Sequence, residues 1–330
     1  MQASTSPPPP IPMIALQNPD RSQTVQALRQ ACQKVGFFYL HDHGVNTTLL
    51  RRVMEESKKL FALSLEEKQA LTDPVLGRGY TAMQEETLDP QNQTQGDTKE
   101  GYYIGKEIPP EDPRYDPKKL RGPNQWPSST VCRNFRPVME EYYQTMCDLG
   151  LSVVRFLAVA LDLPEHYFDS AFMEDPAGPM ASIRLLHYAS VDSIPDRGIF
   201  ACGAHSDYGM ITLLLTDDNP GLQVLTKDQE WVDVPPIPNA FVVNLGDMLE
   251  RWTNGLFRST KHRVLTTANG TERYSIPFFY EPSFDTVVEC LEICKRVDPN
   301  GRARYPPTTS GQHLLDKYKQ THADFQPDGK

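Results

Sequence analysis

The sequence predicts an α+β protein with a mainly β core, in which helices come first and a sandwich or barrel of short strands follows. Apolar residues recur at helical spacing as far as Pro164, whereas after Gly178-Pro179 short apolar runs alternate with Gly, Pro, Asn and Asp. Closely spaced runs of this kind are typical of a β-sandwich or barrel. The 330 residues can bury a large core, as one domain or as two.

Helical patterns account for most of the first half. Residues 20–35 carry apolar side chains at helical spacing, with Asp20 or Ser22 available as the N-cap, and a second pattern covers about 46–63. The longest pattern, 133–161, has a broad apolar stripe. Such a stripe is more often a packing face than a cofactor site, so we expect this helix to brace the sheet domain from outside.

The strand-like runs are short and lie mainly in the second half. One run, at 37–40, follows the first helix. The later runs cover residues 182–188, 211–215, 222–226, 231–234, 240–244, 263–267 and 274–280. Residues 77–127 are rich in Gly, Pro, Gln and Asp and are predicted to form a long irregular connection. Long connections inside compact domains tend to be functional.

Charge and composition exclude several classes of function. Lys and Arg number 33 and Asp and Glu 43, which gives a net charge of −10, and there is no Lys/Arg-rich tract. This balance argues against binding to nucleic acid or to an anionic membrane. The sequence has no apolar run long enough to span a membrane and no Cys-x-x-Cys pair among its six cysteines. We therefore expect a cytoplasmic monomer with reduced thiols.

Three side chains have the chemistry and spacing of metal ligands. His205 and Asp207 are two residues apart just ahead of an apolar strand, so on an extended segment they point to the same side. A second histidine, His262, lies 55 residues after Asp207 (262 − 207). Two histidines and one carboxylate form the facial triad of non-haem iron(II) oxygenases, which leaves coordination positions open for substrates. A zinc hydrolase could use the same three ligands.

Five blocks in a fixed order give the chain a family resemblance. They are His205-x-Asp207, Gly221-Leu222-Gln223-Val224, Asn244-Leu245-Gly246-Asp247, His262-Arg263-Val264, and Arg273-x-Ser275 leading into Phe279-x-Glu281-Pro282. In these blocks the sequence resembles the 2-oxoglutarate- and iron(II)-dependent dioxygenases of the isopenicillin N synthase-like family. The resemblance implies a distorted double-stranded β-helix, or jelly roll, with its core at about 180–284.

The resemblance also implies an arrangement of the whole chain. Four consecutive prolines at 7–10 predict a Pro-rich mobile leader at 1–12, and the resemblance implies an N-terminal dioxygenase region at 13–127 after it. The segment 128–330 then holds the brace helix, the jelly-roll domain and a C-terminal helical tail. His41-x-His43 has the spacing of a second metal pair, but relatives carry a similar signature there that supports the fold.

The resemblance assigns cofactor roles residue by residue. It implies that the triad binds Fe(II), and that Arg273, Ser275 and Tyr188 bind the distant carboxylate of 2-oxoglutarate. It also implies dioxygen as the oxidant and ascorbate as a reductant. Relatives usually carry Asn where Leu186 stands, a departure that suggests a divergent subgroup.

The expected substrate is a small molecule, on family analogy alone. Phe279 matches a ring that borders the substrate pocket in relatives, and Tyr102 or Tyr103 is a second candidate for this pocket, although ordinary packing explains either tyrosine equally well. Arg184 is either an anion anchor near the mouth of the pocket or a buried partner of a nearby acid.

The implied reaction couples oxidative decarboxylation of 2-oxoglutarate, to succinate and carbon dioxide, to hydroxylation or a related C–H oxidation. One alternative is an iron oxidase of the same family that works without 2-oxoglutarate, of the oxidative cyclisation type. The other is a non-catalytic binding protein that keeps the fold. The intact triad argues against the latter, since burying three convergent ligands without a metal is costly.

Overall fold

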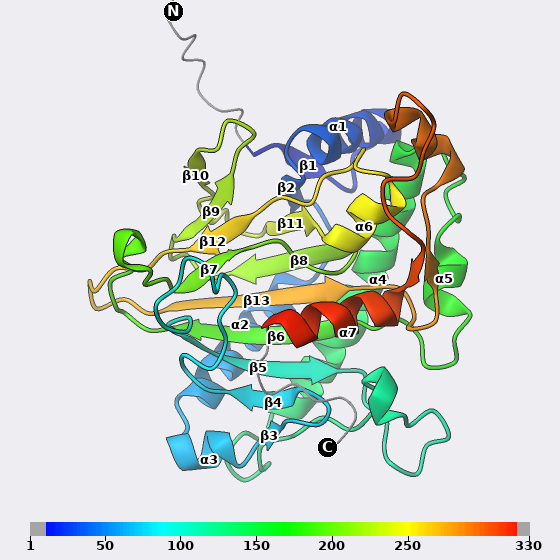
Figure 1. The fold of residues 1–330 in the computed structure, drawn as a ribbon. Helices are drawn as coiled ribbons and strands as arrows, with labels where there is room; N and C mark the ends of the chain where they lie inside the picture. The colour runs from blue at the N-terminus through cyan, green and yellow to red at the C-terminus, as the bar shows by residue number, and fades with distance from the viewer. Residues whose placement is uncertain (1–10, 322–330) are drawn as a thin grey trace, which may run out of the picture.

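A computed structural model describes residues 11–321, and a large sheet forms the centre of this part of the chain (Figure 1). Within these residues the sheet has nine strands, and most neighbouring strands are antiparallel. In sheet order they are β1 (Met13–Ala15), β2 (Phe37–His41), β11 (Phe241–Leu245), β8 (Ile211–Thr216), β13 (Arg273–Tyr280), β6 (Ser182–Tyr188), β5 (Lys99–Gly105), β4 (Arg78–Thr81) and β3 (Thr72–Asp73).

A smaller sheet faces the large one and closes the jelly roll. Its order is β10 (Trp231–Asp233), β9 (Leu222–Leu225), β12 (His262–Val264) and β7 (Cys202–His205). Buried side chains from both sheets meet in one cluster, including Leu186 and Tyr188 from the large sheet and Val224 and Val264 from the small one. The predicted jelly roll is confirmed, and its interior lies between the two sheets.

Helices cover the outer face of the large sheet. α1 (Arg21–Lys34) and α2 (Thr47–Phe61) pack against the long α4 (Phe135–Ala160), and both α2 and α4 contact β13. Asp20 and Asn46 cap the first two helices with side-chain hydrogen bonds to backbone N–H groups, which satisfies donors that a helix start leaves free. The predicted brace helix is confirmed as α4.

Alternation along β6 separates the two faces of the sheet. Ile183 and Leu185 lie in the outer core beneath the helices, whereas Leu186 and Tyr188 lie in the interior cluster. His187 belongs to the outer side, where its Nδ1 lies 2.7 Å from Glu100. The interpretation of His187 as a residue facing away from the metal site is therefore confirmed.

The prediction of an irregular connection over 77–127 is wrong in part. β4 and β5 extend the large sheet there, and β5 pairs with β6 along its whole length, from Lys99 opposite Tyr188 to Gly105 opposite Ser182. Lys99 and Glu100 are buried on opposite faces, each in an ion pair. Because charged residues occupy buried positions in β5, its sequence lacks the alternation of apolar and polar residues by which a strand is predicted.

Shorter elements complete the described chain. They are α3 (Leu65–Gln69), α5 (Asp169–Met173), α6 (Asp247–Trp252), the 3-10 turns Pro117–Lys119, Pro195–Arg197 and Glu292–Val297, the pair β14 (Val287–Val288) and β15 (Thr308–Thr309), and α7 (Ser310–Thr321). Figure 1 shows α7 on the side of the large sheet opposite α4.

Among residues 11–321, no helix combines the length and apolarity that crossing a membrane requires. Most of the predicted leader, residues 1–10, lies outside the described residues.

Candidate active site

The three predicted metal ligands converge at one point in the interior. One ligand atom from each of His205, Asp207 and His262 lies within 4.8 Å of the others. Oδ1 of Asp207 is 3.6 Å from Nε2 of each histidine. Within the described residues, no other group of three or more His, Cys, Asp or Glu side chains comes together in this way. Two imidazoles and one carboxylate are the donor set of a mononuclear iron(II) site with open positions.

The strands of the small sheet bring the ligands together. His205 ends β7 and His262 begins β12, and the two residues are directly paired across these antiparallel strands. Their ring centroids are 4.3 Å apart. Asp207 follows two residues after His205, in the turn before β8. The pairing of β7 with β12 thus brings His262 close to Asp207, although the two are 55 residues apart in sequence.

Backbone carbonyls fix the orientation of both imidazoles. Nδ1 of His205 is 2.8 Å from the carbonyl oxygen of Gly203, and Nδ1 of His262 is 3.3 Å from that of Thr260. A carbonyl oxygen only accepts hydrogen bonds, so each Nδ1 must carry the proton. In the neutral imidazole each Nε2 is therefore the atom with the free lone pair, and both lie toward Oδ1 of Asp207.

Two polar side chains orient the Asp207 carboxylate. The hydroxyl of Thr212 and the side-chain amide of Asn244 both donate to its Oδ2, the latter at 2.6 Å. The opposite oxygen, Oδ1, is left to face the histidines. Thr212 and Asn244 sit opposite each other on β8 and β11, so the large sheet sets the position of this carboxylate. The sequence analysis gave neither of them a role, although Asn244 lies in one of the five blocks.

The charges of the triad are coupled. Burial, followed by the neighbouring His205, lowers the pKa of His262 to about 4. Burial opposes ionisation of Asp207, but the two histidines and the two donors outweigh it and lower the pKa of that carboxyl. Burial likewise opposes protonation of His205, but Cys202, Asp207 and the Gly203 carbonyl raise its pKa to about 9. A cation that binds here meets an ionised carboxylate and must displace a proton from His205.

Arg273 is a buried cation in the same interior, with free hydrogen-bond donors. Only 3% of its surface is exposed, and its Nε and Nη1 have no hydrogen-bond partner among the described residues. The guanidinium carbon lies 4.9 Å from the ring centre of Tyr188, which is its partner across β13 and β6. Ser275 is fully buried two residues further along β13. Leu186, at the position where relatives carry Asn, lies opposite Ser275.

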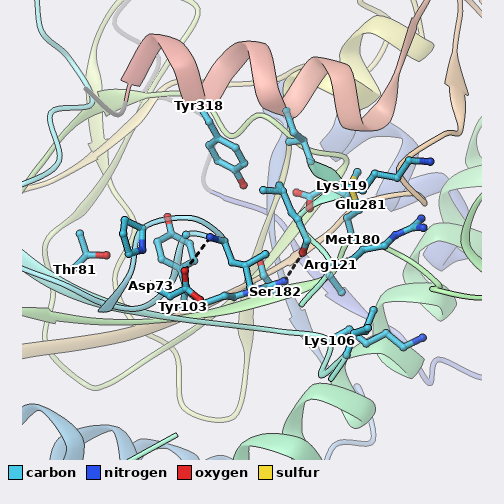
Figure 2. A pocket seen from close by; sticks show the side chains of 18 of the residues that line it. Asp73, Thr81, Tyr103, Lys106, Lys119, Arg121, Met180, Ser182, Glu281 and Tyr318 are labelled. Atoms are coloured by element: carbon cyan, nitrogen blue, oxygen red, sulfur yellow. Dashed lines mark hydrogen bonds between the residues drawn. The ribbon is translucent and has the colours of Figure 1, made fainter. Parts of the chain in front are cut away.

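The predicted substrate-pocket residues lie on different faces of the large sheet, and only some of them are near a pocket. Tyr103 lines a pocket between α7 and the large sheet (Figure 2). Phe279, on β13, lies opposite Ser182, which lines the same pocket. Tyr102 points the other way: it is fully buried against Phe135, and its hydroxyl donates to the carbonyl of Gln125. Its position therefore does not support a substrate role.

Arg184 forms a buried ion pair with Glu86. Its Nη1 and Nη2 donate to the carboxylate of Glu86 at 3.1 and 2.8 Å, and its guanidinium lies over the ring of Tyr103 at 4.4 Å. Of the two interpretations considered for Arg184, the structure agrees with a buried partner of a nearby acid. It does not present a free guanidinium to an anion.

Comparison with known proteins places this geometry in a family. The N-terminal part, residues 11–129, matches the family model described as non-haem dioxygenase in morphine synthesis N-terminal, and residues 180–282 match the 2OG-Fe(II) oxygenase superfamily. A 2-oxoglutarate-Fe(II) type oxidoreductase, hxnY, of Emericella nidulans is 39% identical over 92% of this chain and 86% of its own. The chain belongs to the 2OG-Fe(II) oxygenase superfamily. It is an Fe(II)- and 2-oxoglutarate-dependent oxidoreductase.

Two further relatives of this oxygenase have similar length. Homoarginine-6-hydroxylase 2-ODD-C23 of Glycine max is 36% identical over 94% of this chain and 92% of its own. A full-length Neurospora crassa protein, crystallised in complex with alpha-KG, is 31% identical, covers 94% of this chain and 96% of its own, and superposes with a TM-score of 0.81. The donor set of the triad and the unpaired buried guanidinium of Arg273 fit the Fe(II) and 2-oxoglutarate that this family uses.

Replacing Asn244 with alanine is expected to weaken metal binding about 10- to 100-fold, because loss of a residue that orients a ligand typically costs that much affinity. Titration of the apoprotein with Mn(II) or Fe(II) measures the change. Asn219→Ala is a matched control, since its amide donates to Asp217 at 3.0 Å, outside the triad. Equal metal affinities for the two variants would show that Asn244 does not support the site.

Proposed function

We propose that His205, Asp207 and His262 bind the Fe(II) and that Arg273, with Ser275 and Tyr188, binds the distant carboxylate of 2-oxoglutarate. The observation that carries this proposal is the guanidinium of Arg273, buried with two donor nitrogens unpaired. A buried cation without a partner is costly, whereas a carboxylate from solution would satisfy its planar donor fork. The triad alone would fit other metal chemistry, but the buried guanidinium of Arg273 would be stabilised by an anionic co-substrate.

The side chains of this protein have distinct tasks in the proposed reaction. Fe(II), when bound, supplies the redox chemistry that couples decarboxylation of 2-oxoglutarate to succinate with oxidation of a C–H bond. Oδ1 of Asp207 and the two Nε2 atoms would hold it, and the hydrogen bonds from Thr212 and Asn244 keep Oδ2 turned away from the histidines. The protein's own contribution is to position the C–H bond and to exclude water.

The alternative of an oxidase that does not use 2-oxoglutarate leaves Arg273 without a partner. A binding protein without catalysis would require neither the converging ligands nor the oriented carboxylate. Both alternatives therefore leave buried polar groups unexplained, and we favour the 2-oxoglutarate-dependent reaction, giving hydroxylation or a related C–H oxidation of a small molecule. The names of the relatives do not specify that molecule: one acts on homoarginine, and another is named only as an oxidoreductase.

Anaerobic titration of the apoprotein with Fe(II) and 2-oxoglutarate tests the proposal without knowledge of the second substrate. A weak visible charge-transfer band is expected when the co-substrate chelates the iron. Iron binding without this band would favour the oxidase that works without 2-oxoglutarate. A protein that binds no iron would remove the triad from its proposed role.

Arg273→Gln is expected to raise the 2-oxoglutarate concentration needed for half of this band about 10- to 100-fold, the usual range for a lost charge-assisted hydrogen bond. Iron binding should persist, because Arg273 is not a ligand. Arg263→Gln is a matched control on β12, where the guanidinium bonds to Gln223 and lies over Trp231 at 4.1 Å. An unchanged requirement in Arg273→Gln would remove Arg273 from the anchor role.

We also propose that the enzyme is a cytoplasmic monomer. All six cysteines are free, which suits a reducing compartment. Light scattering on the purified protein at micromolar concentration tests the oligomeric state, and a dimer mass would overturn that part.

A further inference from the structure

A pocket lies between α7 and the inner face of the large sheet, and Figure 2 shows its lining. Tyr318 of α7 covers it from one side. Tyr103 of β5 and Ser182 of β6 lie on the opposite side. Glu281, the residue after β13, lies beneath α7 in the same lining. The pocket therefore combines aromatic walls with a carboxylate.

Cross-strand pairs connect this pocket to the metal ligands. Ser182 on β6 lies opposite Phe279 on β13, and Phe279 lies opposite Thr212 on β8. The hydroxyl of Thr212 donates to Asp207. Only the width of two neighbouring strands thus separates the wall of the pocket from the residue that orients the metal-binding carboxylate. Glu281 lines the pocket and packs against the turn after Asp207, so this end of the pocket lies beside the segment that carries a metal ligand.

Glu281 is a buried carboxylate without a partner. It is 5% exposed, and no described residue forms a hydrogen bond or ion pair with it. It packs against the turn after Asp207 so closely that a Cβ added at Gly209 would lie 1.7 Å from its Oε1. Burial, with the negative charge of Asp207, raises the pKa of this carboxyl well above its usual range. A cation that pairs with Glu281 would stabilise the ionised form, which burial and Asp207 otherwise disfavour.

Neighbouring charges do not compensate Glu281, because most are already paired. The ion pairs around the pocket are Glu86 with Arg184 and Lys99, Arg121 with Asp175, and Lys119 with Asp285. Lys106 and Arg78 also line the pocket, and neither has an ion pair among the described residues. Figure 2 shows Lys106 on the side of the pocket away from Tyr318 and Glu281, and Arg78 donates its Nη2 to the carbonyl oxygen of Leu120 while its Nε has no partner. Among the described residues, no basic side chain forms an ion pair with Glu281.

We propose that the substrate presents a cationic nitrogen, a protonated amine or a guanidinium, to the carboxylate of Glu281. The C–H bond to be oxidised then lies between this anchor and the triad, and the alkyl part of the molecule lies between Tyr103 and Tyr318. This inference rests on the proposed function, because it assigns the pocket to the substrate that is oxidised. It narrows that substrate from any small molecule to a nitrogenous cation.

Calorimetric titration of the full-length protein loaded with Mn(II) and 2-oxoglutarate tests the inference. The probes are n-butylguanidinium and its neutral isostere n-butylurea, which share size and shape and differ in charge. Wild type is expected to bind the cation at least roughly 10-fold more tightly than the urea, as charged hydrogen-bond partners do. Equal affinities in wild type would overturn the inference before any variant is made.

Glu281→Gln keeps the shape of the side chain and removes its charge, and it is expected to weaken binding of n-butylguanidinium roughly 10- to 100-fold. Binding of n-butylurea should change little. Glu85→Gln is the matched control, since Glu85 also lines the pocket but is exposed and accepts a hydrogen bond from the Ala82 N–H at 2.7 Å. An equal loss in both variants would indicate only attraction to a negative surface and would overturn the assignment to Glu281.

Two outcomes separate this inference from the proposed function. If the Fe(II)–2-oxoglutarate band forms but the cation binds no better than the urea, the substrate assignment fails and the oxygenase assignment stands. If the band does not form in wild type, the proposed function itself fails. Tighter binding of n-butylurea that survives in Glu281→Gln would show that a protonated Glu281 donates to a neutral ligand, which also overturns the inference.

Discussion

His262→Ala is expected to abolish iron binding and, with it, all 2-oxoglutarate turnover. The variant leaves only His205 and Asp207, and no other described His, Cys, Asp or Glu completes a group of three with them. Loss of a residue that merely orients a ligand costs about 10- to 100-fold in affinity, so loss of a ligand should cost at least about 100-fold. Metal content after anaerobic loading and desalting measures the effect directly.

His41→Ala is the matched control for this prediction. His41-x-His43 has the spacing of a metal pair in the sequence, but the structure gives these side chains other partners. Nδ1 of His41 lies 2.9 Å from Asp42, and Nε2 of His43 lies 3.2 Å from the carbonyl oxygen of Asn239. The control should therefore keep its metal and its activity. Metal retained in His262→Ala, or lost in His41→Ala, would overturn the assignment of the site.

The ligands could be predicted because their chemistry is local. His205 ends β7 and Asp207 follows two residues later, a spacing that on an extended segment turns both side chains to the same side. Most strands of the jelly roll were equally visible, because strands such as β6, β8 and β13 are apolar runs bounded by turn residues, whereas β7 was not among the predicted runs. Hydrophobic runs and short-range spacing are properties that a single sequence carries.

The residues that support the site depend on contacts between strands that one sequence does not specify. Thr212 and Asn244 reach Asp207 only because β8 and β11 pair in one register, in which the two residues face each other. Tyr102 and Tyr103 are adjacent, and the pairing of β5 with β6 decides which of them faces the pocket. A shift of one residue would exchange them.

A buried ion cluster explains why β5 was missed and how it serves the site. Lys99 on β5 pairs with Asp97 and with Glu86, and Glu86 in turn pairs with Arg184 on β6. The side chains of these four residues are at most 7% exposed. Asp97 also accepts the N–H of Gly203 at 2.9 Å. The cluster therefore ties the segment before β5 to β7, the strand that carries His205.

Lys99→Met is expected to lower the free energy of unfolding by about 3–5 kcal/mol, because it removes one partner and leaves buried charges uncompensated. Burial alone would lower the pKa of Lys99, but Asp97 and Glu86 raise it well above its usual value. Lys99 is therefore a cation in the wild type, and Lys99→Met removes that positive charge. Chemical denaturation followed by circular dichroism measures the change. Because Asp97 holds Gly203, we also expect weaker metal binding through displacement of His205.

Arg51→Met is the matched control, since Arg51 pairs with Glu55 on the exposed side of α2 at 2.7 Å. Exposed pairs of this kind contribute less than about 1 kcal/mol. If both variants unfold at the same denaturant concentration as the wild type, the cluster adds nothing to stability. If Lys99→Met is destabilised but binds metal as tightly as the wild type, the cluster supports the fold without positioning His205. Loss of both properties together is the result that the contact between Asp97 and Gly203 predicts.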